Sequence, residues 1–457
     1  VGGPPGVVGG PAAFGESRHA VALVVARALD EGVSRRKRAG VAAANPCPDG
    51  SAIFFNPAGL AGLGPTRVSA GVTLIAAQGG FTDDILNQTS DLQNPVIPVP
   101  AVYFTHPLSP KLTVGIGAYA PYGLETKWDS TTSPGRFMGY NTDVRSIYIQ
   151  PTLGYQVSPT FKFGIGFAYI TSRLKLRQRA DFSQQVVPSA LLPPGTRFAA
   201  LGVPTGTDFA DANLEATGDG FAVNFGGIVK VSDKVSIGGH WLTRKKISYD
   251  GTVEFNQVPT GLVLPPNNLL GLPGGTPVDS VVAANFGPGA PLSNGKVTTS
   301  LYMPPQGTLG IEWKFNNSWT FMGDYQYVVW GWFSEVNIDF ENPATPDLAL
   351  HPSNSDTHGF RFGTEYQYDQ KVKLRGGYLY HTGASPDQFV TPLLPEGPRN
   401  EFTIGAGIQL SPKLSADVAY QYIKQNDRRG TVNTAAGNTG LYQFSAHLFG
   451  FGAAYTF

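Results

Sequence analysis

Leu448-Phe-Gly-Phe-Gly-Ala-Ala-Tyr-Thr-Phe457 ends the chain, and its side chains alternate with a period of two. Most odd positions carry a bulky apolar ring, whereas the even positions after Leu448 carry only glycine, alanine or threonine. A period of two is the period of a β-strand, whose successive side chains point to opposite faces. The stretch therefore predicts a strand with one bulky apolar face and one face of small residues.

The same alternation recurs upstream, at residues 309–315, 360–368, 402–410 and 414–422. In these segments the charged residues fall almost wholly on the face opposite the apolar one. A soluble sandwich buries its apolar face, whereas a transmembrane barrel turns that face to lipid and its polar face to the lumen. Alternation alone does not separate the two. The charges assigned to the polar face are Glu312, Asp324, Arg361, Glu365, Lys373 and Arg375.

The connections between the alternating segments separate the two folds. Six are short and rich in turn-forming residues, at 108–111, 157–160, 231–234, 315–318, 368–371 and 410–413. Seven are long, near 81–99, 121–143, 181–218, 256–297, 341–356, 384–400 and 426–441. Strict alternation of short and long connections is typical of an outer-membrane barrel with tight periplasmic turns and larger extracellular loops. The sequence therefore predicts an all-β fold, a transmembrane antiparallel β-barrel of fourteen strands with both chain ends on the periplasmic side.

Composition agrees with a barrel. Charged residues are 14% of the 457, against roughly 25% in an average soluble domain, and glycine (57 residues) and aromatic residues (12%) are abundant. The longest apolar stretch, 20–29, is too short for a spanning helix and contains Arg27. The formal net charge is zero, so nothing in the charge points to a nucleic-acid partner.

Residues 1–64 lack the strand pattern and are rich in glycine, alanine and proline. A fourteen-stranded barrel leaves a channel unless something fills it. We therefore predict an N-terminal hatch over residues 1–64 that plugs the lumen of a barrel over residues 65–457.

One run in this segment carries a family resemblance. Asp49-Gly-Ser-Ala-Ile-Phe-Phe-Asn-Pro-Ala-Gly-Leu60 resembles the hatch motif of the FadL-type outer-membrane transporters, which take up long-chain fatty acids and monoaromatic hydrocarbons. Residues 1–48 match the family poorly. Further matches are Ala120-Pro-Tyr-Gly-Leu-Glu125, Gly135-Arg-Phe137, Met303-Pro-Pro305 with Leu309-Gly310, Trp330, Pro386-Asp387 and Glu396-Gly-Pro-Arg399.

The resemblance implies a gate and a side exit. Asn56, Pro57 and Ala58 would form the gating part of the hatch. Because Pro57 restricts the residue before it, Asn56 is expected in extended or turn geometry, with its amide free to bond to the barrel wall. Family members release their solute sideways through an inward kink in the third strand, here Leu112 to Tyr122. Gly115, Gly117 and Pro121 could accommodate that kink, although the glycines could equally serve lumen packing.

The two longest loops are too apolar for ordinary solvent-exposed connections. By resemblance they correspond to the loops that form a substrate-capturing groove, and the alternative is that they pack on each other to cap the barrel. The residues assigned to the groove are Leu191, Leu192, Phe198, Leu262, Leu264, Leu269 and Leu270.

No motif predicts an enzyme. None of the seven histidines stands in a recognisable catalytic arrangement, and His351, His358 and Asp356 share a loop that solvation explains. We expect no metal, cofactor or nucleotide. The predicted function is passive transport of hydrophobic small molecules, fatty acids or hydrocarbons, across the outer membrane of a Gram-negative bacterium. The alternatives are a water-filled porin for polar solutes and a structural or adhesive barrel. Expected partners are the ligand, outer-membrane lipid or lipopolysaccharide, and the assembly machinery that reads a C-terminal aromatic residue such as Phe457.

Overall fold

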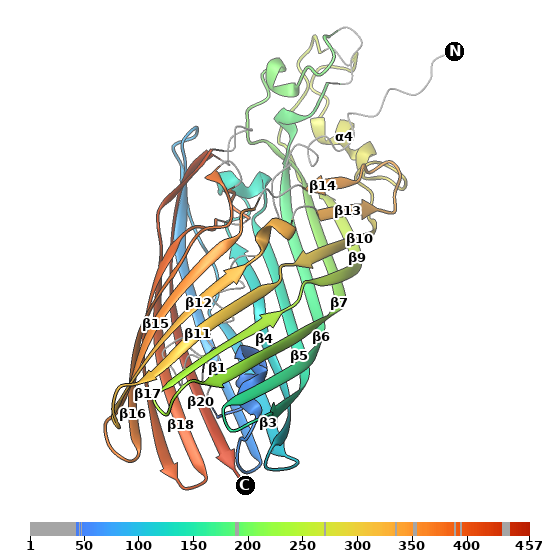
Figure 1. Ribbon diagram of the computed structural model, residues 1–457. Helices are drawn as coiled ribbons and strands as arrows, with labels where there is room; N and C mark the ends of the chain where they lie inside the picture. The colour runs from blue at the N-terminus through green and yellow to red at the C-terminus, as the bar shows by residue number, and fades with distance from the viewer. Residues whose placement is uncertain are drawn as a thin grey trace.

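The computed structural model is one tall, closed β-barrel (Figure 1). It describes residues 43–44, 46, 48–187, 192–268, 271–333, 336–350, 354–387, 390–393, 395–431 and 439–457. Its strands in the first half are β1 (Arg67–Asp83), β2 (Thr89–Asp91), β3 (Ile97–Pro107), β4 (Leu112–Lys127), β5 (Asn141–Gln156), β6 (Phe161–Asp181), β7 (Asp208–Lys230), β8 (Val235–Leu242) and β9 (Lys245–Gln257). Those in the second half are β10 (Gly295–Met303), β11 (Gln306–Lys314), β12 (Trp319–Val328), β13 (Val336–Phe340), β14 (Leu348–Leu350), β15 (Thr357–Gln367), β16 (Val372–His381), β17 (Arg399–Ser411), β18 (Leu414–Gln425), β19 (Arg428–Thr431) and β20 (Thr439–Thr456).

The ring contains fourteen crossings, as the sequence predicts. Six crossings consist of two segments each, namely β2 with β3, β8 with β9, β10 with β11, β12 with β13, β14 with β15 and β18 with β19, so the twenty described strands make fourteen. Every neighbouring pair is antiparallel, and β1 closes the ring against β20 from Arg67–Thr456 to Asp83–Gly440. Closure satisfies the strand edges, which is the condition for a sheet to span lipid.

All six predicted short turns lie between consecutive crossings, but the strands are longer than the apolar pattern indicates. β4 continues to Lys127 instead of ending at Tyr122, and β1 continues to Asp83, within the connection predicted near 81–99. The extra residues extend the paired sheet beyond the end of the hydrophobic alternation. Apolar alternation marks only the part of a strand that faces lipid, so it underestimates these strands.

The two faces of the wall are those expected for a membrane barrel. Phe451 and Leu309 are 47% and 59% exposed on the outside, whereas Glu312 and Arg361 are 1% and 4% exposed on the inside. The apolar face therefore meets lipid and the charged face lines the lumen.

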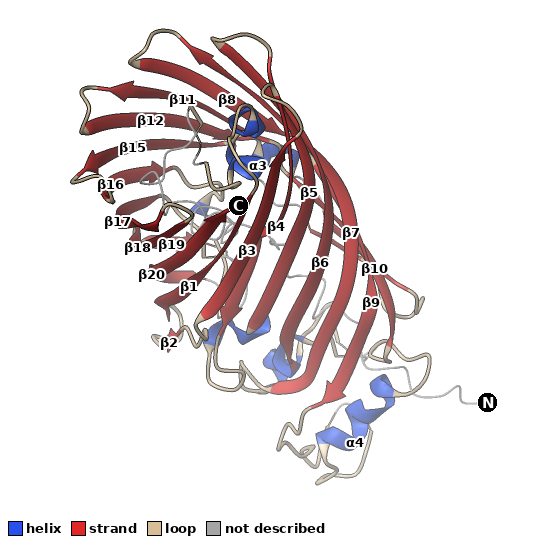
Figure 2. Cartoon of the chain, turned by 90° about the horizontal axis from the view of Figure 1, so that it is seen from below, coloured by secondary structure: helices blue, strands red, loops and turns tan. Residues whose placement is uncertain are grey.

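Short helices occupy the lumen and the loops. Figure 2, seen from below, shows α3 within the ring of strands. Among the residues that the structure describes, no helix has the length and hydropathy needed to cross a membrane. The helical segments are α3 (Ala52–Phe55), η1 (Pro57–Leu60), η2 (Pro134–Phe137), η3 (Phe182–Gln184), η4 (Phe198–Leu201), α4 (Val278–Val282), η5 (Ala283–Phe286) and η6 (Trp330–Trp332).

Candidate functional site

The hatch segment, residues 48–64, lies inside the barrel. Its helices α3 and η1 contact β4, β5, β6 and β7, which form one side of the inner wall. Ile53, Leu60 and Ala58 are fully buried. The described end of the N-terminal segment is thus packed against the wall rather than extended through the lumen.

Asn56 joins three parts of the chain. Its backbone is extended (φ −168°, ψ 102°), as expected for a residue before proline, and it is fully buried. Its Nδ2 donates to the carbonyl of Ala43 at 2.7 Å and to the carbonyl of Gly227 on β7 at 3.1 Å. Its Oδ1 accepts the N–H of Ala58 at 3.1 Å and so caps η1.

Two wall amides hold the helix before Asn56. Gln150 on β5 donates from Nε2 to the carbonyl of Ile53 at 2.6 Å, and Asn224 on β7 donates from Nδ2 to the carbonyl of Phe54 at 2.7 Å. These carbonyls lie at the C-terminal end of α3, where a helix has no partners of its own for them. Neither amide could be singled out from the sequence, because an amide on the lumen face resembles any other polar lumen residue.

Glycine in the wall allows the hatch segment to approach closely. A Cβ on Gly164 would stand 2.1 Å from the carbonyl carbon of Pro57, and one on Gly226 would stand 2.3 Å from Oδ1 of Asn56. Gly115 and Gly117 also face inward, 3.1 and 3.2 Å from side-chain atoms of Ile53 by the same measure. These two glycines therefore pack against the hatch segment, and the kink lies further along β4.

The kink is a β-bulge that contains Pro121. The pairing of β4 with β5 shifts by one residue between Tyr119 and Tyr122. The ladder between β3 and β4 ends at the Ala101–Tyr119 pair, and contact resumes where the Asn94 side chain donates to the carbonyl of Glu125 at 2.5 Å and Gln93 N donates to the carbonyl of Lys127 at 2.6 Å. Between these points the barrel wall has a window.

Prolines account for the window. Pro98 and Pro100 lie on β3 at the positions where the ladder to β4 would continue. The ladder from β3 to β1 is continuous through both, so the strand edge without N–H donors is the one that faces β4. A proline cannot donate to a ladder, and Pro121 adds a third missing donor on the other side.

A cavity of about 120 Å³ lies behind the window. We call it the window cavity. Its lining combines lumen-facing residues with residues on the outer side of β4 and β5, so it connects the two faces of the wall. The residues used below are Ile75, Ile97, Glu125, Asp143, Arg145, Glu396, Arg399 and Phe444.

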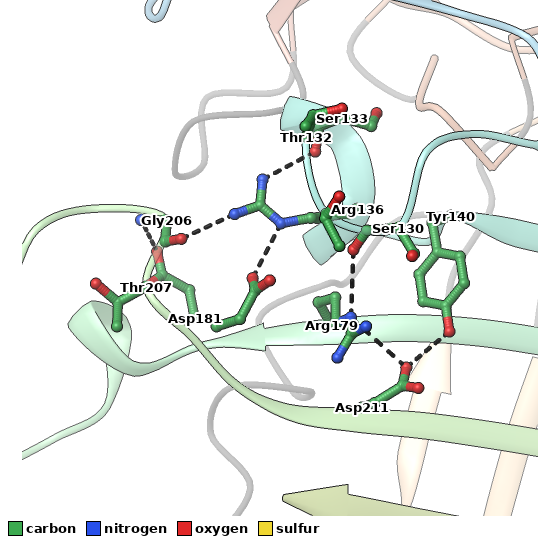
Figure 3. Close-up of polar contacts among 12 residues, drawn as sticks. Ser130, Thr132, Ser133, Arg136, Tyr140, Arg179, Asp181, Gly206, Thr207 and Asp211 are labelled. Carbon is green, nitrogen blue, oxygen red and sulfur yellow. Dashed lines mark hydrogen bonds and ion pairs between the residues drawn. The ribbon is translucent and has the colours of Figure 1, made fainter. Parts of the chain in front are cut away.

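The extracellular end is held by arginines (Figure 3). Arg136 on η2 donates from Nε to Asp208 Oδ1 at 2.9 Å and from Nη2 to the carbonyl of Gly206 at 2.8 Å. Arg179 lies 3.9 Å from Asp211, and it also donates to the carbonyl of Ser130 at 3.3 Å. These contacts explain why Gly135-Arg-Phe137 stands out in the sequence, since its arginine ties the 128–140 connection to the base of the next loop.

Tyr140 belongs to the same network. Burial raises its pKa to about 12, and the hydrogen bond that its hydroxyl donates to Asp211 at 2.8 Å acts in the same direction. Tyr140 therefore remains a neutral donor at any physiological pH.

Several apolar side chains of the two long loops are buried. Phe198 is 5% exposed and stacks on Phe182 with ring centroids 4.4 Å apart, and Leu264 is buried in the same cluster. Leu192 and Leu262 pack at its edge. Leu191, Leu269 and Leu270 lie outside the described residues. The stack of Phe198 on Phe182 and the backbone bond from Leu264 to Thr276 each lie within one loop, and the predicted groove stays a prediction.

Charged residues of the lumen pair with each other on the wall away from the hatch segment. Arg375 on β16 binds Glu365 at 2.9 Å and Asp417 at 3.1 Å, and all three are buried. The polar face of β15, β16 and β18 is thus partly neutralised by its own side chains.

Known outer-membrane proteins match this chain in sequence along most of its length. The sequence profile of the family described as Outer membrane protein transport protein (OMPP1/FadL/TodX) matches residues 16–457. The match includes residues 16–48, which the sequence motifs do not reach. Outer membrane protein P1 of Haemophilus influenzae is 23% identical, over 85% of this chain and 82% of its own length. The long-chain fatty acid transport protein of Escherichia coli O6:H1 is 22% identical, over 90% of this chain and 89% of its own length.

Solved structures share the fold. The FadL homologue of Pseudomonas aeruginosa superposes with a TM-score of 0.77 at 18% identity, and covers 93% of this chain and 98% of its own. The toluene transporter TodX of P. putida superposes with a TM-score of 0.69 at 16% identity, and covers 94% of this chain and 99% of its own.

Proposed function

The chain belongs to the OMPP1/FadL/TodX family of outer-membrane transport proteins, and from that membership we propose that it carries hydrophobic small molecules passively across the outer membrane. Long-chain fatty acids and aromatic hydrocarbons are the candidate solutes, because relatives are named for each. The family description is that of a transport protein, in agreement with the prediction that the chain is not an enzyme.

The window cavity is the observation that carries the proposed route. An apolar solute partitions into lipid far more readily than into water, so a side exit releases it where its free energy is lowest. The prolines of β3 and the bulge of β4 support an exit between these strands. Pro121 acts in this route by breaking the ladder, whereas Gly115 and Gly117 give the hatch segment room.

The hatch segment is the proposed gate. Asn56, Pro57 and Ala58 connect α3, η1 and the wall through bonds that are shielded from water. Their rearrangement would let a solute pass from the lumen to the window. We place the domain boundary at residue 64, with the hatch over 1–64 and the barrel over 65–457.

The apolar loops are the proposed site of first capture. The groove would be formed by Leu191, Leu192, Phe198, Leu262, Leu264, Leu269 and Leu270. Phe198 and Leu264 are already buried in the apolar core cluster, so they would form its base. Outer-membrane lipid or lipopolysaccharide would surround the exposed aromatic rings of the wall. The assembly machinery would read Phe457, which is 60% exposed at the end of β20. Both chain ends are assigned to the periplasmic side of the membrane, where the six short turns lie.

A comparison of uptake with conductance tests this function against a porin. Cells that express the protein should accumulate labelled fatty acid or toluene faster than cells without it, while planar bilayers should show no large steady current. The packed hatch segment and the paired lumen charges favour the quiet trace. A large ohmic current without hydrophobe uptake would identify a porin, and neither signal would identify a structural or adhesive barrel.

A further inference from the structure

The window cavity has two chemically different ends joined by an apolar middle. Ile75, Ile97 and Phe444 line the middle. Arg145 belongs to the exposed outer face of β5 and marks what we call the window end, whereas Glu396 and Arg399 are buried and mark what we call the lumen end. A ligand's polar head binds at the end of the cavity whose polar atoms still lack hydrogen-bond partners.

Arg399 has an unsatisfied donor. Its side chain is 7% exposed, and its Nε donates to Oε1 of Glu401 at 2.9 Å. Its Nη2 is buried and has no hydrogen-bond partner among the described residues. A buried donor of this kind costs free energy until a ligand or water accepts from it.

Glu396 has an unsatisfied acceptor in the same cavity. Its Oε2 accepts the N–H groups of Ala384 at 2.8 Å and Ser385 at 3.1 Å, which fixes the carboxylate. Arg428 donates to its main-chain carbonyl at 2.9 Å and holds the loop in place. Within the described part of the chain, Oε1 of Glu396 is buried without a partner.

The window end is already satisfied. Arg145 donates from Nε to Asp143 at 2.8 Å and from Nη2 to Glu125 at 3.1 Å. Its side chain is 58% exposed, so water also reaches it. A ligand head therefore gains less at the window end than at the lumen end.

We propose that Arg399 and Glu396 form a head-group subsite for an amphiphile whose head accepts one hydrogen bond and donates another, a hydroxyl or a protonated carboxyl group. The head accepts from Nη2 of Arg399 and donates to Oε1 of Glu396. The tail lies along the apolar middle and points to the window, so the ligand leaves tail first. An ionised carboxylate lacks the donor and brings a second negative charge towards Glu396, which disfavours it. The inference rests on the proposed transport and specifies its substrate as a polar-headed hydrophobe.

Three ligands of equal tail length separate the two hydrogen bonds. Dodecanol donates and accepts, dodecyl methyl ether only accepts, and dodecane does neither. Competition against radiolabelled dodecanol, with the full-length protein in lipid nanodiscs and corrected for partition into protein-free discs, gives their relative affinities. We expect dodecanol to bind at least tenfold more tightly than the ether, and the ether more tightly than dodecane.

Glu396→Gln tests the acceptor directly. The N–H groups of Ala384 and Ser385 require an oxygen, so the amide turns its NH2 group to the cavity and replaces an acceptor with a donor. The advantage of dodecanol over the ether should disappear, and the affinity for dodecanoate at pH 8 should rise about tenfold relative to dodecanol. Glu215→Gln makes the same change at a carboxylate of β7 that binds Lys175 and does not line the cavity, and it should leave both ratios as in the wild type.

Equal affinities for dodecanol and the ether in the wild type, or the same shift in Glu215→Gln as in Glu396→Gln, would overturn the subsite and leave these atoms to water. If instead cells take up none of the three ligands, the proposed transport itself is wrong. Heat-modifiable migration of each variant establishes that the barrel is folded.

Discussion

Asn56 acts as a small polar hub in a buried environment. Its side chain makes three hydrogen bonds, which connect the chain at Ala43, the turn at Ala58 and the wall at Gly227. Pro57 restricts the backbone of Asn56 to extended geometry, and this geometry leaves the side-chain amide free to bond to the wall. Its extended backbone and wall bond could therefore be predicted from the sequence. Gln150 and Asn224 could not, because their partners lie about 100 to 170 residues away.

Asn56→Ala should change transport without unfolding the barrel. The substitution leaves the Gly227 carbonyl and the Ala58 N–H without this partner, at a cost of about 1 to 3 kcal/mol, which shifts a gate between two states by roughly tenfold or more. Single-channel recording and uptake of a labelled hydrophobe measure the effect. A wild-type rate together with an equally quiet trace would show that Asn56 is only a turn residue.

The window depends on how β3 and β4 pair and on the bulge in β4. Deleting Pro121 removes the extra residue of the bulge and keeps Tyr122 opposite Ser146, so the side chains beyond it retain their faces. The straightened strand would close the gap to β3, and uptake should fall at least tenfold. Pro151→Ala changes a proline on the lipid-facing side of β5, away from the window, and should leave uptake unchanged. Normal uptake by the deletion variant would place the exit elsewhere.

The long loops give a second prediction for whole segments. Replacing Leu191, Leu192, Leu269 and Leu270 together by serine should weaken hydrophobe capture several-fold, because the apolar surface at the loops is lost. Barrel stability should not change, since the strands contribute the closing hydrogen bonds. Initial uptake rates at low ligand concentration measure capture. Unchanged rates would leave the loops as a cap only.

The whole molecule should behave as a barrel that resists detergent. Without heating, the protein in dodecyl sulfate should migrate faster than after boiling, and its circular dichroism should be dominated by β-structure. Closure through the β1–β20 ladder leaves no free sheet edge from which unfolding could start. A spectrum dominated by helix would contradict the fold.

The fold was predictable from sequence because one physical rule repeats along the chain. Lipid on one side and a filled lumen on the other impose alternation on every crossing, and six short turns set the count. Local chemistry predicted the extended backbone of Asn56 and its bond to the wall, whereas the roles of Asn56 in gating and of Pro121 in the exit stay predictions. The head-group pair of Glu396 and Arg399 depends on the bonds by which Arg428 holds the carbonyls of Ser385 and Glu396, and no local pattern contains that information.

The proposed exit beside the end of the β3–β4 ladder at Ala101–Tyr119 would deliver the solute into the lipid leaflet, a two-dimensional fluid, instead of into an aqueous compartment. Each molecule released through the wall must diffuse away along the leaflet before the next can follow. Turnover should therefore depend on acyl-chain order, and an Arrhenius plot of uptake into proteoliposomes should bend at the gel-to-fluid transition of the host lipid. Lipids with different transition temperatures should move the bend with them, whereas a straight plot in every lipid would indicate release into water.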